Sequence, residues 1–132
     1  MKIPLNYGIN KVGLPLIVTS SKPNLCFLID TGATHNIVFS YVYDELMQYF
    51  SVLGEPHRII GIEGNNKDAF QVRATIAFEC YETTAEFSVI EATEAIGHVQ
   101  NESGIQIHGI LGVPFLVQNK WILDFDKLIL QR

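Results

Sequence analysis

The sequence predicts a mostly-β protein with one or two short helices. Its 132 residues are the length of one domain. Apolar residues make up 48 % of the chain, enough to build a core without metal or disulfide staples. Short β-branched and aromatic segments alternate with turn residues, and no linker or low-complexity segment separates them. We therefore treat residues 1–132 as a single domain.

The predicted strands are short and apolar, and turn residues bound most of them. They cover Leu14–Thr19, Leu25–Ile29, His57–Ile62, Phe70–Cys80, Ala85–Glu91, Ile105–Ile110, Trp121–Phe125 and Leu128–Leu130. The glycines and asparagines of Gly61–Lys67 suit positive φ angles, so this segment is expected to form the tip of a hairpin.

Two segments favour helices. Ser40 is a suitable cap for a helix over Tyr41–Tyr49. Gly112–Asn119 is the second, because Pro114 is tolerated in a first helical turn. The polar segment Thr93–Gly104 fits either a loop or a frayed turn of helix.

Charge and hydropathy argue against a nucleic-acid partner and against a membrane span. The net charge is −5, from 9 basic and 14 acidic residues, and the basic residues are scattered, so we expect no nucleic-acid partner. No apolar run reaches the roughly 18 residues of a membrane span, so no span is expected. The chain starts without a signal-peptide pattern, which suggests a cytoplasmic protein. A trimmed signal would make it periplasmic or secreted, and the compartment stays open.

Cysteines and histidines do not form a metal-binding pattern. Cys26 and Cys80 adjoin apolar runs and are expected to be core residues. The four histidines lack the spacing of metal ligands, so we predict no metal and no cofactor.

One motif carries chemistry. Phe27–Ile29 is an apolar strand segment, and Asp30-Thr31-Gly32-Ala33 follows it directly. A carboxylate at the end of a buried strand is held rigidly, and Gly32 permits an unusual backbone path and the close approach of a second chain. An isolated Asp-Thr-Gly is more often a simple turn cap. Here a matching element lies far downstream, where the apolar Ile110 and Leu111 lead into Gly112 and a short helix.

This pair of elements resembles the retropepsin-like aspartic peptidases, over about Leu14 to Leu130. The resemblance implies a closed β-barrel of the acid-protease type. It also implies that Asp30 is the catalytic carboxylate and that a polypeptide is the substrate. By the same resemblance, the catalytic loop is supported by Thr31, Gly32 and Ala33, and the second glycine loop consists of Ile110, Leu111 and Gly112. The flap that covers the substrate would include Ile60, Gly61, Ile62 and Gly64.

The chain departs from the retroviral pattern after the second glycine. Retroviral enzymes place an Arg-Asp or Arg-Asn pair there, whereas this chain has Val113 and Pro114. The run Gly109–Leu116 is closer to the bacterial branch of the family. Dimer contacts that depend on the missing arginine are not carried over.

Only one Asp-Thr-Gly occurs, although aspartic peptidases use two carboxylates. We therefore expect a homodimer in which each chain supplies Asp30. By resemblance, the terminal strands within Trp121–Leu130 interleave between the chains. Two alternatives remain: a non-catalytic dimerisation or peptide-binding module, and a monomer whose partner is a different protein with its own Asp-Thr-Gly.

Overall fold

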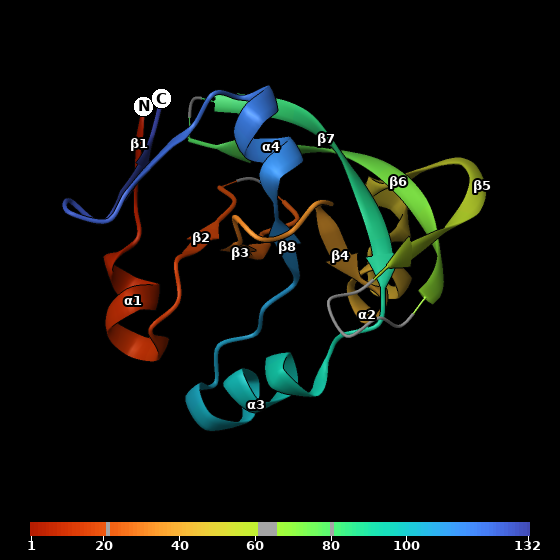
Figure 1. Cartoon of the computed structure of the whole chain (residues 1–132), viewed down its shortest axis with the longest axis horizontal. Helices are drawn as coiled ribbons and strands as arrows, with labels where there is room; N and C mark the ends of the chain where they lie inside the picture. The colour runs from red at the N-terminus through yellow and green to blue at the C-terminus, as the bar shows by residue number, and fades with distance from the viewer. Residues whose placement is uncertain (21, 61–65, 80) are drawn as a thin grey trace.

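The computed structural model describes residues 1–20, 22–60, 66–79 and 81–132 (Figure 1). Strands dominate these described residues, and each of their helices is short. The strands are β1 (Lys2–Pro4), β2 (Leu16–Val18), β3 (Cys26–Ile29), β4 (Ile37–Phe39), β5 (Ser51–Ile60), β6 (Asn66–Phe78), β7 (Tyr81–Ile90), β8 (Gly109–Leu111), β9 (Ile122–Asp124) and β10 (Ile129–Gln131). The helices are α1 (Asn6–Val12), α2 (Ser40–Glu45), a 3₁₀ turn at Met47–Tyr49, α3 (Glu94–Ser103) and α4 (Val113–Gln118).

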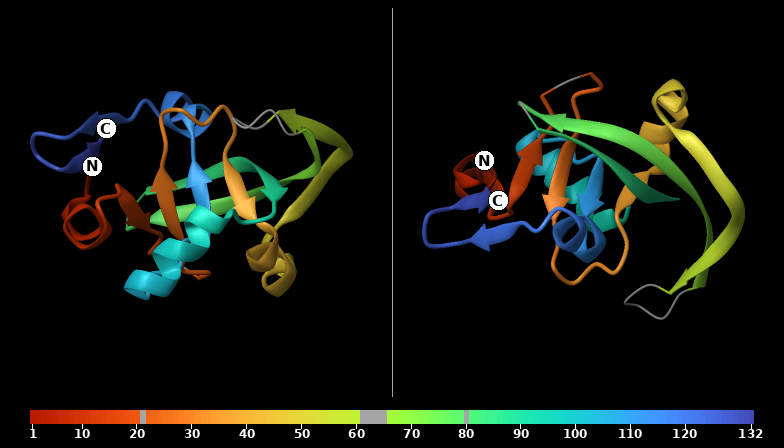
Figure 2. Two further views of the ribbon diagram at one scale, coloured as in Figure 1. Left: turned by 60° about the horizontal axis from the view of Figure 1, so that its bottom comes forward. Right: turned by 90° about the horizontal axis from the view of Figure 1, so that it is seen from above.

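The main sheet has seven strands in the order β2-β3-β8-β4-β7-β6-β5. Strand β8 comes from late in the chain, yet it lies between β3 and β4, parallel to β3 and antiparallel to β4. The connection from β3 to β4 must therefore pass across the end of β8. This crossing places residues 30–36, which we call the Asp30 loop, beside the start of α4 (Figure 2).

The core lies inside the curl of this sheet. Its largest fully buried side chains include Phe27, Phe39, Phe87 and Phe115. Phe27 and Phe87 stack with their ring centroids 5.7 Å apart, which joins β3 to β7. Burial of one such side chain contributes on the order of 1.5–3 kcal/mol, so the strands that carry the Asp30 loop rest on a well-stabilised core.

A second, three-stranded sheet joins the two ends of the chain in the order β1-β10-β9. Ile3 faces Leu130 across the antiparallel β1–β10 pair, and both side chains are buried. The terminal amine of Met1 donates a hydrogen bond to the carbonyl of Arg132, and the Arg132 amide donates one to the Met1 carbonyl. The N and C termini therefore lie side by side (Figure 1).

Two features of the predicted fold class need correction. Strand pairing leaves β2 and β5 as open edges of the seven-stranded sheet, so a closed barrel is not observed among the described residues. The sheet curls far enough for the Ser20 amide, just after β2, to donate to the Ala77 carbonyl of β6. The described residues form four short α-helices, not one or two. None of the described helices is long and apolar enough to span a membrane.

The predicted helices are largely confirmed, with adjusted ends. Phe39, not Ser40, takes the N-cap position of α2, and the α-helix ends at Glu45, with the 3₁₀ turn covering the rest of the predicted segment as far as Tyr49. Helix α4 follows Gly112 with Pro114 in its first turn, as predicted. The ambiguous segment 93–104 is a helix, because Thr93 Oγ1 accepts a hydrogen bond from the Ile96 amide and Gly104 ends it at φ 76°.

The predicted hairpin is present up to its tip. Strands β5 and β6 pair antiparallel as far as Ile60 and Asn66, so they converge on residues 61–65. Three of the four predicted flap residues, Gly61, Ile62 and Gly64, lie outside the described residues. For the fourth, Ile60, only its place at the end of β5 is described.

Candidate active site

Asp30 is the first residue after β3, and its backbone is anchored to the neighbouring strand. Its amide donates to the Leu111 carbonyl of β8 at 3.0 Å. Its side chain is half-buried, and Oδ1 accepts the Gly32 amide at 2.9 Å. The Ala33 amide donates to the Asp30 carbonyl at 3.2 Å. The carboxylate is thus held by its own turn, because a charge-assisted bond from a backbone amide fixes one oxygen.

The outer part of the Asp30 loop is open to solvent. Thr31, Gly32 and Thr34 are exposed, and Ala33 is half-buried. Gly32 does not have a left-handed φ angle, and a methyl group added there would meet only Asp30 Oδ1, at 3.3 Å. The predicted need of Gly32 for an unusual backbone path is therefore wrong within this chain. Its closeness to a second chain stays a prediction.

The second glycine element lies directly beside the Asp30 loop in the folded chain. Strands β3 and β8 run parallel with Leu28 opposite Ile110 and Ile29 opposite Leu111, so Asp30 and Gly112 follow in adjacent positions. The Val113 amide donates to the Ala33 carbonyl at 2.9 Å. The structure thus brings the Asp loop and the second glycine loop together, as predicted.

Gly112 is buried at this junction and leaves no room for a side chain. A Cβ atom added to it would lie 2.5 Å from the Ala33 carbonyl oxygen and 2.8 Å from that of His35. Both are backbone atoms, which move only if the loop moves. The close packing of these two turns explains why the second element needs a glycine.

Asn36 joins both turns to the sheet and was not identified from the sequence. Only 4 % of it is exposed. Its Oδ1 accepts the Gly112 amide at 3.0 Å, and its Nδ2 donates to the Glu86 carbonyl of β7 at 3.1 Å. An asparagine just before a strand is a common turn residue. Only the contact of Asn36 with Gly112 in the folded structure distinguishes it from an ordinary turn residue.

The other end of the β3–β8 pair holds a buried polar contact. His108 Nδ1 accepts the Cys26 amide at 2.8 Å, so this ring nitrogen carries no proton. Burial lowers the pKa of His108, and burial raises the pKa of the Cys26 thiol to about 11. Cys26 is a buried core residue, as predicted, and its thiol stays protonated at neutral pH. Cys80 lies outside the described residues.

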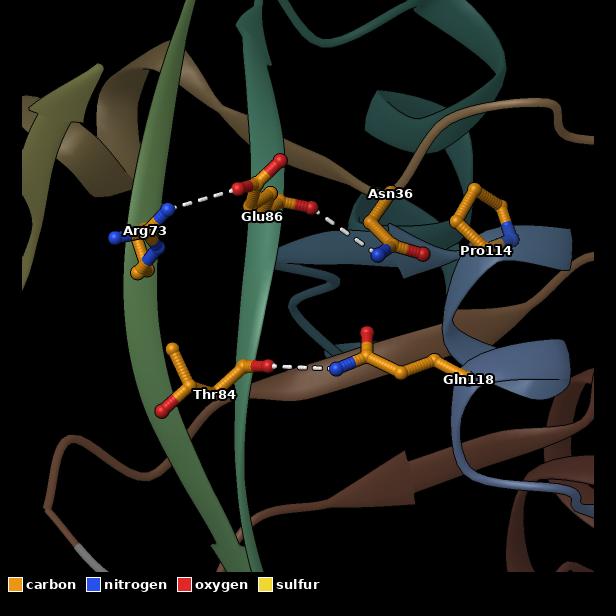
Figure 3. A pocket seen from close by; sticks show the side chains of 6 residues that line it. All are labelled: Asn36, Arg73, Thr84, Glu86, Pro114 and Gln118. Atoms are coloured by element: carbon orange, nitrogen blue, oxygen red, sulfur yellow. Dashed lines mark hydrogen bonds and ion pairs between the residues drawn. The ribbon is translucent and has the colours of Figure 1, made fainter.

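A shallow polar pocket of about 340 Å³ lies between β6, β7 and α4. Figure 3 shows its six lining residues, Asn36, Arg73, Thr84, Glu86, Pro114 and Gln118. The Arg73–Glu86 ion pair at 3.0 Å is about half exposed on both sides, so it contributes little to stability. The pocket includes neither Asp30 nor Gly112 and is separate from the carboxylate.

No cluster of three or more histidine, cysteine or acidic residues forms a metal-binding geometry in the part of the chain that the structure describes. The carboxylate of Asp124 stabilises a turn of the chain. Its Oδ1 accepts the amides of Asp126 and Lys127 at 2.9 and 3.0 Å, which closes the turn between β9 and β10.

Comparison with known proteins identifies the fold. No protein-family model and no curated protein sequence matches the chain. Solved structures do match, among them the EIAV protease in complex with the inhibitor HBY-793, with a TM-score of 0.57, 20 % identity, and coverage of 84 % of this chain and 92 % of that one. Another is the retroviral protease-like domain of Ddi1 from Leishmania major, with a TM-score of 0.54, 12 % identity and 89 % coverage of both chains. The chain has a retropepsin-like fold.

Proposed function

We propose that this protein is an aspartic endopeptidase whose active site forms between two copies of the chain. The observation that carries the proposal is the Asp30 carboxylate. It is half-buried at the end of β3, held through Oδ1 by the Gly32 amide, and set in a retropepsin-like fold. Its neighbours Thr31 and Gly32 are exposed and available to a second Asp30 loop. The narrower assignment to a bacterial branch rests on the run Gly109–Leu116 and stays a prediction.

Two such carboxylates supply both an acid and a base. Like charges about 3 Å apart cannot both ionise, so the pair shares one proton. The ionised carboxylate removes a proton from a bound water, and the oxygen of that water forms a bond to the scissile carbonyl carbon. The protonated carboxyl gives its proton to the carbonyl oxygen. Collapse of the resulting diol breaks the C–N bond, and the leaving nitrogen takes up a proton.

The substrate in this proposal is an extended polypeptide. The neighbour with the highest TM-score given above, the EIAV protease, was solved with an inhibitor. In the present chain β5 and β6 form a long antiparallel hairpin, whose strands offer backbone groups of the kind that pair with extended peptides. A covering role for Ile60, Gly61, Ile62 and Gly64 stays a prediction.

The decisive variant is Asp30→Asn. It keeps the shape of the side chain but cannot act as the base, so cleavage of a peptide library, assayed at several pH values, should fall about 100- to 10,000-fold. The circular dichroism spectrum should stay unchanged. Asp44→Asn is the matched control, because Asp44 is an exposed carboxylate on α2, and it should keep full activity. Full cleavage by Asp30→Asn would refute the mechanism.

A mixing experiment tests the shared site. If each active unit takes one Asp30 from each chain, a tenfold excess of Asp30→Asn protein captures most wild-type chains in mixed dimers. Wild-type activity should then fall about tenfold by mass action. Unchanged activity in the mixture would show that one chain is sufficient. Dimers without any cleavage would instead indicate the non-catalytic module.

A further inference from the structure

The polar pocket of Figure 3 contains hydrogen-bonding groups that the chain itself does not use. On one wall, Arg73 donates to Glu86 through a single nitrogen, Nη2, at 3.0 Å, although a guanidinium offers five N–H donors. On the other wall, Gln118 donates through Nε2 to the Thr84 carbonyl at 3.3 Å. The second carboxylate oxygen of Glu86 and the amide oxygen of Gln118 have no hydrogen-bond partner among the described residues. Donors and acceptors therefore remain available around a cavity of about 340 Å³.

Part of the pocket wall is an edge of β7 that pairs with no strand in the described part of the chain. Strand β4 joins β7 only at Ser88, whose amide donates to the Asn36 carbonyl. The amide and the carbonyl of a strand residue point to the same side, and every second residue repeats this direction. Thr84 and Glu86 therefore present both groups to the pocket. Their carbonyls accept the side chains of Gln118 and Asn36 (Figure 3), whereas neither amide has an acceptor among the described residues.

These groups favour a ligand that accepts and donates hydrogen bonds at the same time. A lone anion at Arg73 is repelled by the Glu86 carboxylate, which lies 3.0 Å from the guanidinium, and a lone cation at Glu86 is repelled by Arg73. A peptide group has a carbonyl acceptor, an N–H donor and no net charge. It can therefore bond both members of the ion pair without the cost of desolvating a further charge. Extended peptides bind sheet edges through main-chain hydrogen bonds of this kind.

We infer that this pocket binds a short stretch of extended polypeptide through its peptide groups, apart from the Asp30 carboxylate. The edge of β7 from Thr84 to Glu86 spans about 7 Å, so it faces two or three residues of an extended chain. Arg73 and Glu86 bond the carbonyl and N–H groups of the bound segment. Pro114, which lines the pocket from α4, supplies an apolar contact.

Asn36 joins this pocket to the candidate site. It lines the pocket, donates to the Glu86 carbonyl at 3.1 Å and accepts the Gly112 amide at 3.0 Å. Asp30 and Gly112 follow paired residues of β3 and β8, so the carboxylate and the pocket lie on either side of one supporting turn. A long polypeptide can therefore contact both places, and the pocket serves as a second contact for the substrate. The identity of this polypeptide as the substrate rests on the proposed function, whereas the binding of peptide groups does not.

The first test is an NMR titration of the ¹⁵N-labelled protein with acetyl-triglycine amide, which has peptide groups but no charge and no side chains. The backbone amide signals of Thr84 and Glu86 and the side-chain amide signal of Gln118 should shift and saturate. Sodium acetate and ethylammonium chloride, each with a single charged group of one sign, should cause no saturable shift at the same concentrations. The absence of a saturable shift with the tripeptide, or an equal response to acetate, would overturn the inference.

A pair of variants locates the binding. Arg73→Ala removes a donor to the peptide carbonyl, so the dissociation constant of the tripeptide should rise about tenfold. The Arg73–Glu86 pair is half exposed, so its loss should leave the fold intact, which circular dichroism checks. Lys11→Ala is the matched control, because Lys11 is an exposed cation on α1, and it should leave the constant unchanged. Equal constants for the two variants would exclude the pocket as the binding site.

The second test compares two peptide substrates that share one cleavable core. One has the core alone, and the other adds six glycine and serine residues on each side, which reach about 20 Å when extended. In the wild-type protein the longer peptide should have a KM about tenfold lower at similar kcat. Arg73→Ala should remove this advantage and leave the KM of the core unchanged.

The outcomes separate the pocket from the proposed function. Equal KM values for the two substrates in the wild-type protein would refute the pocket as a substrate contact, even though the protein cleaves peptides. Saturable tripeptide binding that depends on Arg73, in a protein that cleaves no peptide, would support the peptide site and refute the proposed function.

Discussion

The turns that end β3 and β8 lie side by side, but their surroundings are opposite. At the end of β3, Gly32 is exposed, and the nearest atom to an added Cβ is the side-chain oxygen of Asp30 at 3.3 Å. At the end of β8, Gly112 is buried, and an added Cβ would lie 2.5 Å from a backbone oxygen. The turn after β3 carries the Asp30 carboxylate, and the turn after β8 packs against the backbone of that loop. Substitutions in the two turns should therefore separate chemistry from stability.

Gly112→Ala should have the largest effect on stability. The added methyl group meets two backbone carbonyls, so the Asp30 loop must shift, at a cost of about 1–3 kcal/mol or more. Gly32→Ala is the matched control and should change the free energy of unfolding by less than about 0.5 kcal/mol. Urea unfolding of both variants measures the difference. Equal losses in the two variants would contradict the contrast between the buried and the exposed turn.

Asn36→Ala should weaken the supporting turn in a different way. It leaves the buried Gly112 amide and the Glu86 carbonyl without their hydrogen-bond partner, which costs about 1–3 kcal/mol. Asn101→Ala, at an exposed position of α3, is the control and should be nearly neutral. Peptidase activity should fall more in Asn36→Ala than in Asn101→Ala under conditions where both are folded, because Asn36 positions Gly112. Equal free energies of unfolding for the two variants would show that the hydrogen bonds of Asn36 do not stabilise the turn.

The smallest expected effect is a pH dependence at the far end of the same strands. The pKa of His108 is lowered in the folded protein from its ordinary value of 6.5, so protonation favours the unfolded chain. The stabilisation is complete above about pH 6.5 and is lost as the pH falls from there toward the lower folded-state pKa. His108→Gln should flatten the dependence of the free energy of unfolding in this window. An unchanged slope would show that His108 is not the responsible group.

The sequence was sufficient for elements whose pattern is local. The Asp-Thr-Gly turn, the strands around it and the helix after Gly112 each have a local signature in composition or turn chemistry. Strands β1 and β4 were not predicted, because three-residue strands carry too little periodicity. Helix α1 was missed as well, since Leu5 at its N-cap position makes no side-chain cap hydrogen bond.

The role of Asn36 illustrates what local patterns leave out. Its hydrogen bonds run to residues 50 and 76 positions away in the chain, so nothing near it in the sequence signals its contacts. The closed barrel was likewise expected from resemblance alone, and the observed pairing leaves β2 and β5 as edges.

The sequence by itself determined which residues form the two turns, because an apolar strand followed by Asp-Thr-Gly, or by a glycine and a helix, is specified within a few neighbouring residues. Only the tertiary structure decided that the turns meet. Their contact depends on the parallel pairing of β3 with β8, on the burial of Gly112 against the Asp30 loop, and on Asn36. These are long-range pairings, and their free energy comes from a core and backbone hydrogen bonds that form only when the whole chain has folded.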